Sequence, residues 1–458
     1  MINRTGFRSL LESCEGDHLR FARRMTHLMG LTDHRGRHHF RSGDGKLNRT
    51  LKNPDDTTRR LDPHEISLRG LAESVLGENW DRQMGKVRAW LQLRELFESD
   101  PTNEGRTVLE DDGAGAIMPS AFANINAFTA VASGLLEVGI LEAYESPEFI
   151  ADQLAPVEPS KQFEGRKTIG AARLGDVAEE RLPGMPTKRV QFGERWLTQP
   201  RTVENSLACE LTQEAVYLDL TGGQVTEHAN SVGDWLAYRK ELRVIDSFIG
   251  TGQESGAPGY NIYLFNYKGT SYNPFAAAGA LYDNDITSGN ELLYRANIQA
   301  AEIKFRDMVD PETATRIRVT PNTMLVNREK FYVAEDLFTA DKVEFRDSPG
   351  ATSGDKATRY GNNALKGKYR VLESPLVFER CDAADGLNLS TAASGTIWWL
   401  FESGTRTHSY IQNWPLRTQT AAPNQVDMID RGLVLFVKAD ERGIPMWKDP
   451  RRVVRNKA

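Results

Sequence analysis

Cysteine is scarce in this chain. Its 458 residues include three cysteines, Cys14, Cys209 and Cys381, which lie far apart in the sequence. A disulfide framework uses an even and denser set, and no CxxC or Cys/His pair has the spacing of a zinc site. The count therefore fits a reducing compartment and excludes a small disulfide-stapled scaffold.

Long apolar runs are also missing. No run approaches the roughly 20 residues that a membrane helix needs. The first residues, Met-Ile-Asn-Arg-Thr-Gly, lack the apolar segment of a signal peptide. We expect a protein that is soluble, intracellular when made and not bound to a membrane.

The chain as a whole has no excess of positive charge. It carries 57 Lys and Arg against 63 Asp and Glu, so the net charge is -6 and the pI about 5.9. This balance argues against a broadly basic nucleic-acid-binding surface, but not against a protein that surrounds nucleic acid. Residues 1–60 are locally basic. The 40% apolar and 26% charged residues are typical of a globular protein with a large core.

No catalytic, cofactor or metal site stands out. There is no GxSxG or HExxH sequence, and no carboxylate pair is singled out by its spacing. The glycines at 113/115, 222/223 and 250/252 lack the Lys-Ser/Thr of a phosphate-binding loop and are interpreted as turns. We expect no enzymatic activity.

Two groups of residues could in principle bind a metal or act as a nucleophile, but each is better explained without a functional site. His34, His38 and His39 could face one side of a helix and bind a transition metal, but the flanking arginines and Gly36 favour a solvated basic segment. Cys209 next to Glu210 is interpreted as a buried structural cysteine and not as an activated thiol.

The N-terminal region predicts helices and then a boundary. Helices are expected over Phe7–Met29 and from Asp62, an N-cap, to about Ser99. The small, acidic stretch Glu110–Ala116 is the best domain boundary. A further helix is expected over Pro119–Val138, where apolar residues recur at helical spacing.

The region after residue 155 predicts an extended ribbon. Strand-like runs at Lys167–Leu174 and Lys188–Trp196 flank a turn at Pro183–Pro186. An isolated ribbon is marginally stable in water, so we expect this one to rest on a neighbouring copy of the chain.

A long amphipathic helix is predicted from about Thr226 to Ile249, ended by Gly250 and Gly252. Its apolar residues form two stripes, which implies contacts on more than one side. A helix of about 25 residues spans roughly 37 Å.

The remainder predicts mixed helices and strands. A helix is expected at Glu291–Val309 with Ser288 as its cap, and another at Glu329–Phe338. Arg316–Val319 is expected to pair with Thr323–Val326. Four further strands are expected at Tyr369–Leu372, Thr396–Phe401, Ser409–Leu416 and Gly432–Lys438. Trp398 and Trp399 are interpreted as core residues.

The order of these elements resembles a known family. The ribbon precedes Leu211-Thr212-Gln213-Glu214, a phrase of the form [IL]-[ST]-x-E, and the long helix ends in Phe248-Ile249-Gly250. The chain closes on 449–455, Asp-Pro-Arg-Arg-Val-Val-Arg. This order is similar to that of tailed-phage major capsid proteins with the Hong Kong 97-type fold, an α+β fold, over residues 110–458.

The resemblance implies a division of the chain into six segments. Residues 1–112 would be a scaffolding (delta) segment, cleaved near Gly113, Ala114, Gly115 and Ala116. The remaining segments would be an N-arm with a linker helix, an E-loop, a P-domain with its spine helix, an A-domain and closing P-domain strands, at 113–155, 156–205, 206–250, 251–395 and 396–458.

The resemblance also places contacts between subunits on the E-loop. Lys167, Lys188, Arg189 and Trp196 would lie on this ribbon and contact a neighbouring copy. In some members of the family a ribbon lysine is joined covalently to an asparagine of a neighbour. Asn413, Asn424 and Asn456 are the corresponding candidates here, with exposed, unlinked lysines as the alternative.

The implied function is that of a major capsid protein in a phage or prophage. The chain would form pentamers and hexamers of an icosahedral shell around double-stranded DNA, made in the host cytoplasm and ending in the virion. Portal, prohead protease and decoration proteins would be its other partners, with no cofactor. The alternatives are an encapsulin-like compartment with protein cargo, and a cytosolic enzyme with an unrecognised site.

Overall fold

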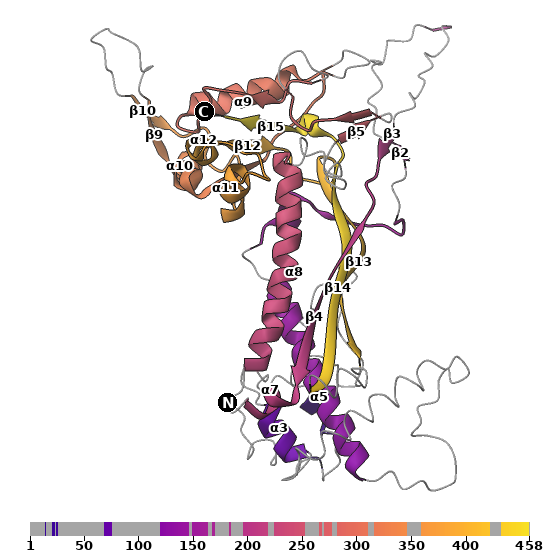
Figure 1. Ribbon diagram of the computed structural model, residues 1–458. Coiled ribbons are helices and arrows are strands. Elements are labelled where there is room, and N and C mark those ends of the chain that lie inside the picture. The colour runs from indigo at the N-terminus through magenta and orange to yellow at the C-terminus, as the bar shows by residue number, and fades with distance from the viewer. Residues whose placement is uncertain are drawn as a thin grey trace. The chain divides into compact units, whose positions relative to one another are not determined.

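The computed structural model describes residues 14, 21–22, 24–25, 68–75, 120–145, 149–163, 167–169, 183–184, 196–218, 224–251, 265–267, 270–276, 282–309, 316–345, 359–421 and 432–457. They form helices and mixed sheets (Figure 1), so the predicted α+β class is confirmed. The chain divides into two compact units. Unit 1 is Met1–Ser146, Glu204–Tyr238 and Trp414–Arg442, and unit 2 is Pro147–Val203, Arg239–Asn413 and Gly443–Ala458.

The longest helix is α8, Gln224–Ile249, with 26 residues (Figure 1). The prediction of this helix is confirmed, and its length is about 39 Å at 1.5 Å per residue. Its first part belongs to unit 1 and its last part to unit 2. Gly250, at φ 84°, ends the helix, and its amide donates to the carbonyl of Asp246 at 3.1 Å. This is the left-handed cap that the glycine predicts.

The core of unit 1 forms around α5, Ser120–Tyr144, a helix that extends beyond the predicted Val138. Helix α3, Leu68–Val75, contacts both α5 and α7, Gln213–Leu218. The described N-terminal residues belong to the same core, and their buried side chains are Cys14, Phe21, Met25, Leu68 and Leu71. The rest of the two helices predicted before residue 100 lies outside the described residues.

Gly233 of α8 lies directly against α5. A β-carbon at this position would overlap the backbone carbonyl of Ile140 and approach the side chain of Ala143. The glycine therefore permits the close approach of the two helices inside unit 1.

A four-stranded sheet has the order β1-β13-β14-β4. Its strands are β1 Val157–Pro159, β4 Val203–Thr212, β13 His408–Ala421 and β14 Leu433–Trp447. Strands β13 and β14 confirm two predicted strands and are longer than predicted. Strand β4 was not predicted, because most of its side chains are exposed and its apolar residues do not alternate regularly.

A five-stranded sheet of unit 2 has the order β11-β8-β12-β15-β7. Its strands are β7 Asp285–Ile286, β8 Thr323–Val326, β11 Arg370–Glu373, β12 Trp398–Phe401 and β15 Val453–Asn456. Every residue of β8, β12 and β15 is buried. Trp398 and Trp399 are among them, so their interpretation as core residues is confirmed.

Helices α9, Arg295–Asp307, and α10, Arg328–Thr339, lie against this sheet, α9 beside β15 and α10 beside β8 and β11. Figure 1 shows both helices close to the sheet. The short helices α11, Pro375–Asp382, and α12, Thr391–Thr396, follow β11 and contact each other.

Two local predictions in this region are wrong. Residues 316–319 do not pair with β8; Arg316 instead forms a single bridge with Val309. Both edges of β8 are already occupied, by β11 and β12. Ser288 is not a helix cap, because α9 begins later with Tyr294 at its N-cap and a reciprocal bond to Asn297.

The remaining elements of unit 2 are small. A sheet of order β2-β3-β5-β6 combines Lys167–Ile169, Trp196–Thr198, Phe265–Tyr267 and Thr270–Tyr272. Strands β9, Lys342–Phe345, and β10, Arg359–Asn362, pair antiparallel. Helix α6 spans Ala151–Leu154, and a 3-10 turn spans Pro450–Arg452.

The unit 2 part of α8 buries polar side chains, each with a partner. Glu241 accepts from the amide of Ala151 at 2.6 Å and from the Ser374 hydroxyl at 3.2 Å. Ser247 is hydrogen-bonded to Nε2 of His408 at 2.8 Å. Burial lowers the pKa of His408 to about 3, so this imidazole is neutral in the folded chain near neutral pH.

Asp246 and Arg380 form a buried ion pair in the same region. Nε of Arg380 donates to Oδ1 of Asp246 at 2.6 Å, and another nitrogen of this guanidinium reaches Asp385 at 3.0 Å. Burial raises the pKa of Asp246, while the hydrogen bond and charge of Arg380 act in the opposite direction. The arginine therefore limits the cost of burying this carboxylate.

We expect Gly233→Ala to lower the free energy of unfolding of the chain by about 2 kcal/mol, because the methyl group overlaps the α5 backbone. Helix propensity alone predicts the reverse sign, a gain of about 1 kcal/mol. Chemical denaturation of the purified protein measures the difference. Ser231→Ala, at an exposed position of the same helix, is the matched control and should change stability by less than about 0.5 kcal/mol. A stabilised Gly233→Ala variant would contradict the close contact.

We expect Arg380→Met to cost about 3 kcal/mol at pH 7, because Asp246 loses its cation while remaining buried. The folded-state pKa of Asp246 then rises further above its unfolded value. Such a group contributes stability below the unfolded pKa and loses it as the pH rises through the folded pKa. The deficit should therefore shrink as the pH falls from 7 toward 4, which denaturation of variant and wild type at several pH values measures. Asp385→Asn, at an exposed partner of the same arginine, is the control; a deficit independent of pH would contradict the assignment.

Candidate functional site

The described residues contain no group of three or more His, Cys, Asp or Glu side chains placed to hold a metal ion. His34, His38 and His39 lie outside the described residues. Within the described ranges, the helices are all too short or too polar to cross a membrane.

The three cysteines lie inside the protein. All three are buried and unpaired with one another. Burial, and then the neighbouring charge of Glu210, raises the pKa of Cys209, which opposes formation of a reactive thiolate. The prediction that Cys209 is buried is confirmed.

The base of the predicted ribbon is visible. Strand β2 pairs antiparallel with β3, with Lys167 opposite Thr198 and Ile169 opposite Trp196. The ribbon is not isolated at its base, because Leu197 of β3 also pairs with Tyr267 of β5. Trp196 is half-buried.

The other predicted contact and cleavage residues are not placed. Lys188 and Arg189 lie outside the described residues, and so do Gly113, Ala114, Gly115 and Ala116. Their roles stay predictions.

Two of the candidate asparagines for a covalent link are engaged within the chain. Asn413 donates to the carbonyls of Ser160 and Gln162 at 2.8 and 2.9 Å. Asn456 is fully buried in β15 and accepts from the amide of Asn290 at 2.8 Å. The buried amide of Asn456 is therefore inaccessible to a lysine of another copy, while Asn424 lies outside the described residues.

Large aromatic side chains are exposed in both units. In unit 1, Trp235 of α8 is 63% exposed and meets Tyr238 edge to face at 5.7 Å. In unit 2, Tyr294 before α9 and Tyr332 of α10 are exposed to a similar degree. Exposed aromatic residues are frequent anchors of protein interfaces, so these are candidate contacts with another chain.

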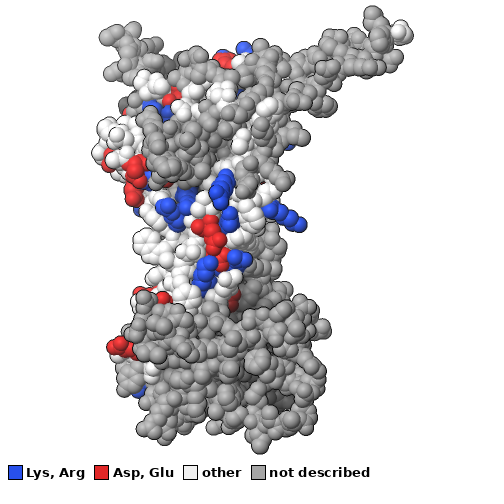
Figure 2. Space-filling view, turned by 45° about the vertical axis from the view of Figure 1, so that its right-hand side comes forward, with Lys and Arg blue, Asp and Glu red and all other residues white. Residues whose placement is uncertain are grey.

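Charges of both signs lie close together on the surface. On the face shown in Figure 2, the described Lys and Arg side chains alternate with Asp and Glu side chains. That face has no uniformly basic area in its described part, which agrees with the acidic balance of the chain.

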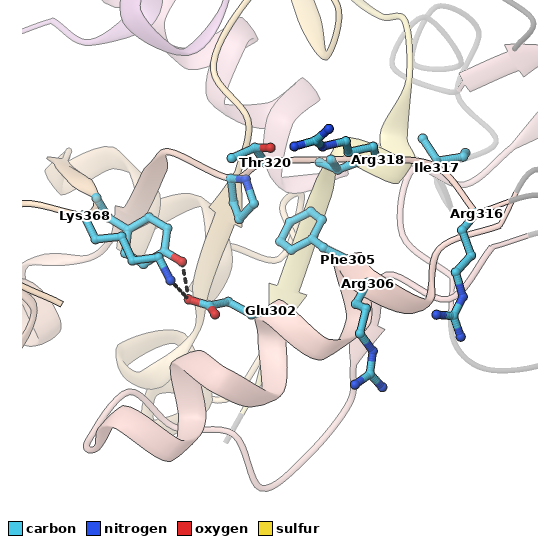
Figure 3. Close-up of a pocket in the computed structure, with 11 residues that line it drawn as sticks. Glu302, Phe305, Arg306, Arg316, Ile317, Arg318, Thr320 and Lys368 are labelled. Carbon is cyan, nitrogen blue, oxygen red and sulfur yellow. Dashed lines mark hydrogen bonds and ion pairs between the residues drawn. The ribbon is translucent and has the colours of Figure 1, made fainter. Parts of the chain in front are cut away.

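A groove of about 460 Å³ lies in unit 2 between the end of α9 and the extended segment 316–321 (Figure 3). Its apolar surface includes Phe305, Ile317, Val319 and Pro321. The charged side chains that line it are Glu302, Arg306, Arg316, Arg318 and Lys368.

The acids of this groove are engaged by its own residues. Glu302 accepts from Lys368 at 2.7 Å and also from the hydroxyl of Tyr369. Burial, followed by this bond to Glu302, raises the pKa of Tyr369, so the phenol stays protonated as the donor. Figure 3 shows the Glu302 carboxylate turned toward Lys368.

The arginines of the groove are less completely neutralised. Arg306 binds Asp307 through two nitrogens, each at 2.9 Å, and these bonds lower the pKa of Asp307. Arg316 reaches the same carboxylate at 3.7 Å, and Figure 3 shows Arg306 and Arg316 extending in the same direction. Arg318 is exposed and makes no ion pair with any described residue. The groove therefore presents guanidinium groups to solvent.

Sequence reasoning did not find this groove. Its lining comes from residues 302–306, 316–321 and 368–369, which the fold brings together. The one available signal was the Arg-x-Arg pair at 316 and 318, which the sequence analysis interpreted as part of a strand.

The chain was compared with known proteins. A family model described as phage capsid protein matches residues 199–456. No curated protein matches the chain.

Several solved structures are similar to the chain at low identity. A phage-related protein of Bordetella bronchiseptica is 14% identical, covering 70% of this chain and 95% of that one, with a TM-score of 0.37. A structure from Gordonia phage Cozz is 12% identical, covering 68% and 86%, with a TM-score of 0.38. An encapsulin of Synechococcus elongatus is 10% identical, covering 68% and 87%, with a TM-score of 0.38.

The family assignment rests on the sequence match, not on these structural similarities. The matched range begins just before β4, contains the whole of α8 and ends in β15. Since this range is more than half of the sequence, the chain belongs to the phage capsid protein family.

Proposed function

We propose that the chain is the major capsid protein of a tailed phage or prophage, with a Hong Kong 97-type fold. It assembles into pentamers and hexamers of an icosahedral shell that encloses double-stranded DNA. The observation that carries this proposal is the family match over residues 199–456. Its role is structural, its site of assembly is the host cytoplasm, and its final location is the virion.

The architecture supports a role in assembly through two elements. Helix α8 is a rod of 26 residues whose end is fixed by the Gly250 cap. Strands β2 and β3 form the base of a ribbon, and residues 170–195 join them in the sequence. Contacts between two different surfaces of identical copies close into rings, and many weak contacts of this kind stabilise a whole shell.

The chain segments take the following proposed roles. Residues 113–155 form the N-arm, 156–205 the E-loop, 206–250 the spine of the P-domain, 251–395 the A-domain, and 396–458 the closing strands. Lys167, Lys188, Arg189 and Trp196 are the E-loop residues that contact a neighbouring subunit. Portal, prohead protease and decoration proteins are further partners.

The proposed enclosure of DNA does not need a DNA-reading surface. The chain has a net charge of -6, and the described charges on the face in Figure 2 are mixed. A wall of this kind holds DNA by confinement and repels it weakly, whereas tight binding requires many basic contacts with phosphates.

Removal of residues 1–112 is the proposed maturation step. In the single chain Phe21, Met25, Leu68 and Leu71 share the core of unit 1 with α5. Their removal would uncover apolar side chains of this core, to which Val131 and Leu135 of α5 also belong. These side chains would then need a new partner, which an adjacent subunit of the shell supplies.

The function is tested by expressing the full chain and imaging the product by negative-stain electron microscopy. We expect closed particles of uniform size. Particles purified from phage-producing or induced lysogenic cells should contain double-stranded DNA that survives external nuclease treatment. Particles holding a protein cargo and no DNA would favour an encapsulin-like compartment, and a small oligomer under all conditions would overturn the proposal.

The maturation step is tested by intact-mass spectrometry of DNA-filled particles. We expect the chain to begin near Gly113–Ala116, because this small-residue stretch separates the N-terminal segment from α5. Empty particles made from the chain without phage proteins should retain the full mass and serve as the control. Mature particles that still contain residues 1–112 would exclude cleavage.

A further inference from the structure

The groove between α9 and segment 316–321 holds positive charge that the described residues around it do not neutralise. Arg306, Arg316, Arg318 and Lys368 face two acids, Glu302 and Asp307. Both acids are already bonded to groove cations, and Arg318 has no described acidic partner. The local excess is two positive charges among these six residues.

The C-terminal end of α11 carries an excess of negative charge. Glu379, Asp382 and Asp385 are exposed on the last turn of α11 and the residues after it. Arg380 reaches Asp385, but it also neutralises the buried Asp246. Asp382 accepts a bond from the hydroxyl of Thr391, which carries no charge. Carboxylates at a helix C-terminus are further destabilised by the helix dipole, so a cation from elsewhere is favoured there.

The backbone holds this acidic end in a fixed shape. The amides of Leu387 and Asn388 donate to the carbonyls of Arg380 and Ala383 at 3.0 and 3.3 Å. A β-carbon on Gly386 would overlap the carbonyl of Arg380, so the turn closes tightly on α11. A preorganised group of carboxylates loses little conformational entropy when it binds.

We propose that the arginine groove binds the acidic end of α11 of a second copy of this chain. Guanidinium groups bind carboxylates through two parallel hydrogen bonds, and the groove offers such groups beside an apolar surface. The two surfaces lie on one chain, as a contact between unlike faces of identical copies requires. The inference rests on the proposed function, and it identifies one contact within that assembly.

Nucleic acid is the less favourable occupant. A surface that binds DNA phosphates is broadly basic, whereas this groove contains Glu302 and borders on Asp307. The chain as a whole is acidic. The carboxylates of another copy meet the same guanidinium groups without requiring an extended basic surface.

The contact is tested by charge reversal in the full-length chain. Arg318→Glu and the double change Glu379→Lys/Asp382→Lys should each lower the fraction of chain in closed shells by about tenfold or more, measured by sedimentation and electron microscopy. Combining all three changes should restore shells, because Glu at 318 then faces Lys at 379 and 382 in the next copy. Each variant subunit should keep the melting temperature of the wild type, since all three positions are exposed.

Arg406→Glu is the matched control, because Arg406 is an exposed arginine of unit 2 outside both surfaces. It should assemble like the wild type. Normal shells from either reversal, or no recovery in the combined variant, would overturn the inference while leaving the proposed function in place. If Arg318→Glu forms normal shells that have lost only their DNA, the groove binds DNA phosphates, and the inference of a contact between copies is overturned as well. A wild-type chain that forms no shells overturns the proposed function, and this contact with it.

Discussion

The contacts that α8 makes within each of the two units are the constraint on which the rest of the structure depends. Its first part contributes Ala229, Val232 and Leu236 to the core of unit 1. Its last part buries Val244 and Phe248 together with polar groups that each need a partner. An apolar contact tolerates small shifts of a helix, whereas buried carboxylates tolerate few, because each must keep its hydrogen bonds. The polar end of the helix therefore fixes the position of α8 within unit 2.

The same constraint explains why Arg380 is important beyond its own helix. It is buried, neutralises Asp246 of α8, and reaches Asp385 in the turn after α11. One guanidinium thus joins α8 to the acidic end of α11, which we propose as a contact with another copy. Both surfaces of that contact, the acidic end and the arginine groove, belong to unit 2 and to the range matched by the capsid family.

The sequence predicted the elements whose apolar residues recur regularly. Helices α5 and α8 follow their helical spacing, and the Trp398–Trp399 strand is buried as its composition indicates. Strand β4 escaped prediction because its exposed side chains remove the alternating pattern. The predicted pairing of 316–319 with β8 was wrong because β11 and β12 occupy both edges of β8. These two strands come from distant parts of the sequence, so a local pattern does not reveal them. Among the candidate contacts, the base of the ribbon could be predicted from its own stretch of sequence. The groove could not, because its lining comes from three segments that are separated in the sequence.

Burial of all three cysteines has a practical consequence for following assembly. Cys209 and Cys381 are also held in the protonated form by burial, and Cys14 is covered in the unit 1 core. The folded chain therefore exposes no native sulfhydryl to maleimide reagents. A single cysteine introduced on the surface gives one fluorophore per subunit, and energy transfer between differently labelled subunits can then report ring closure in real time.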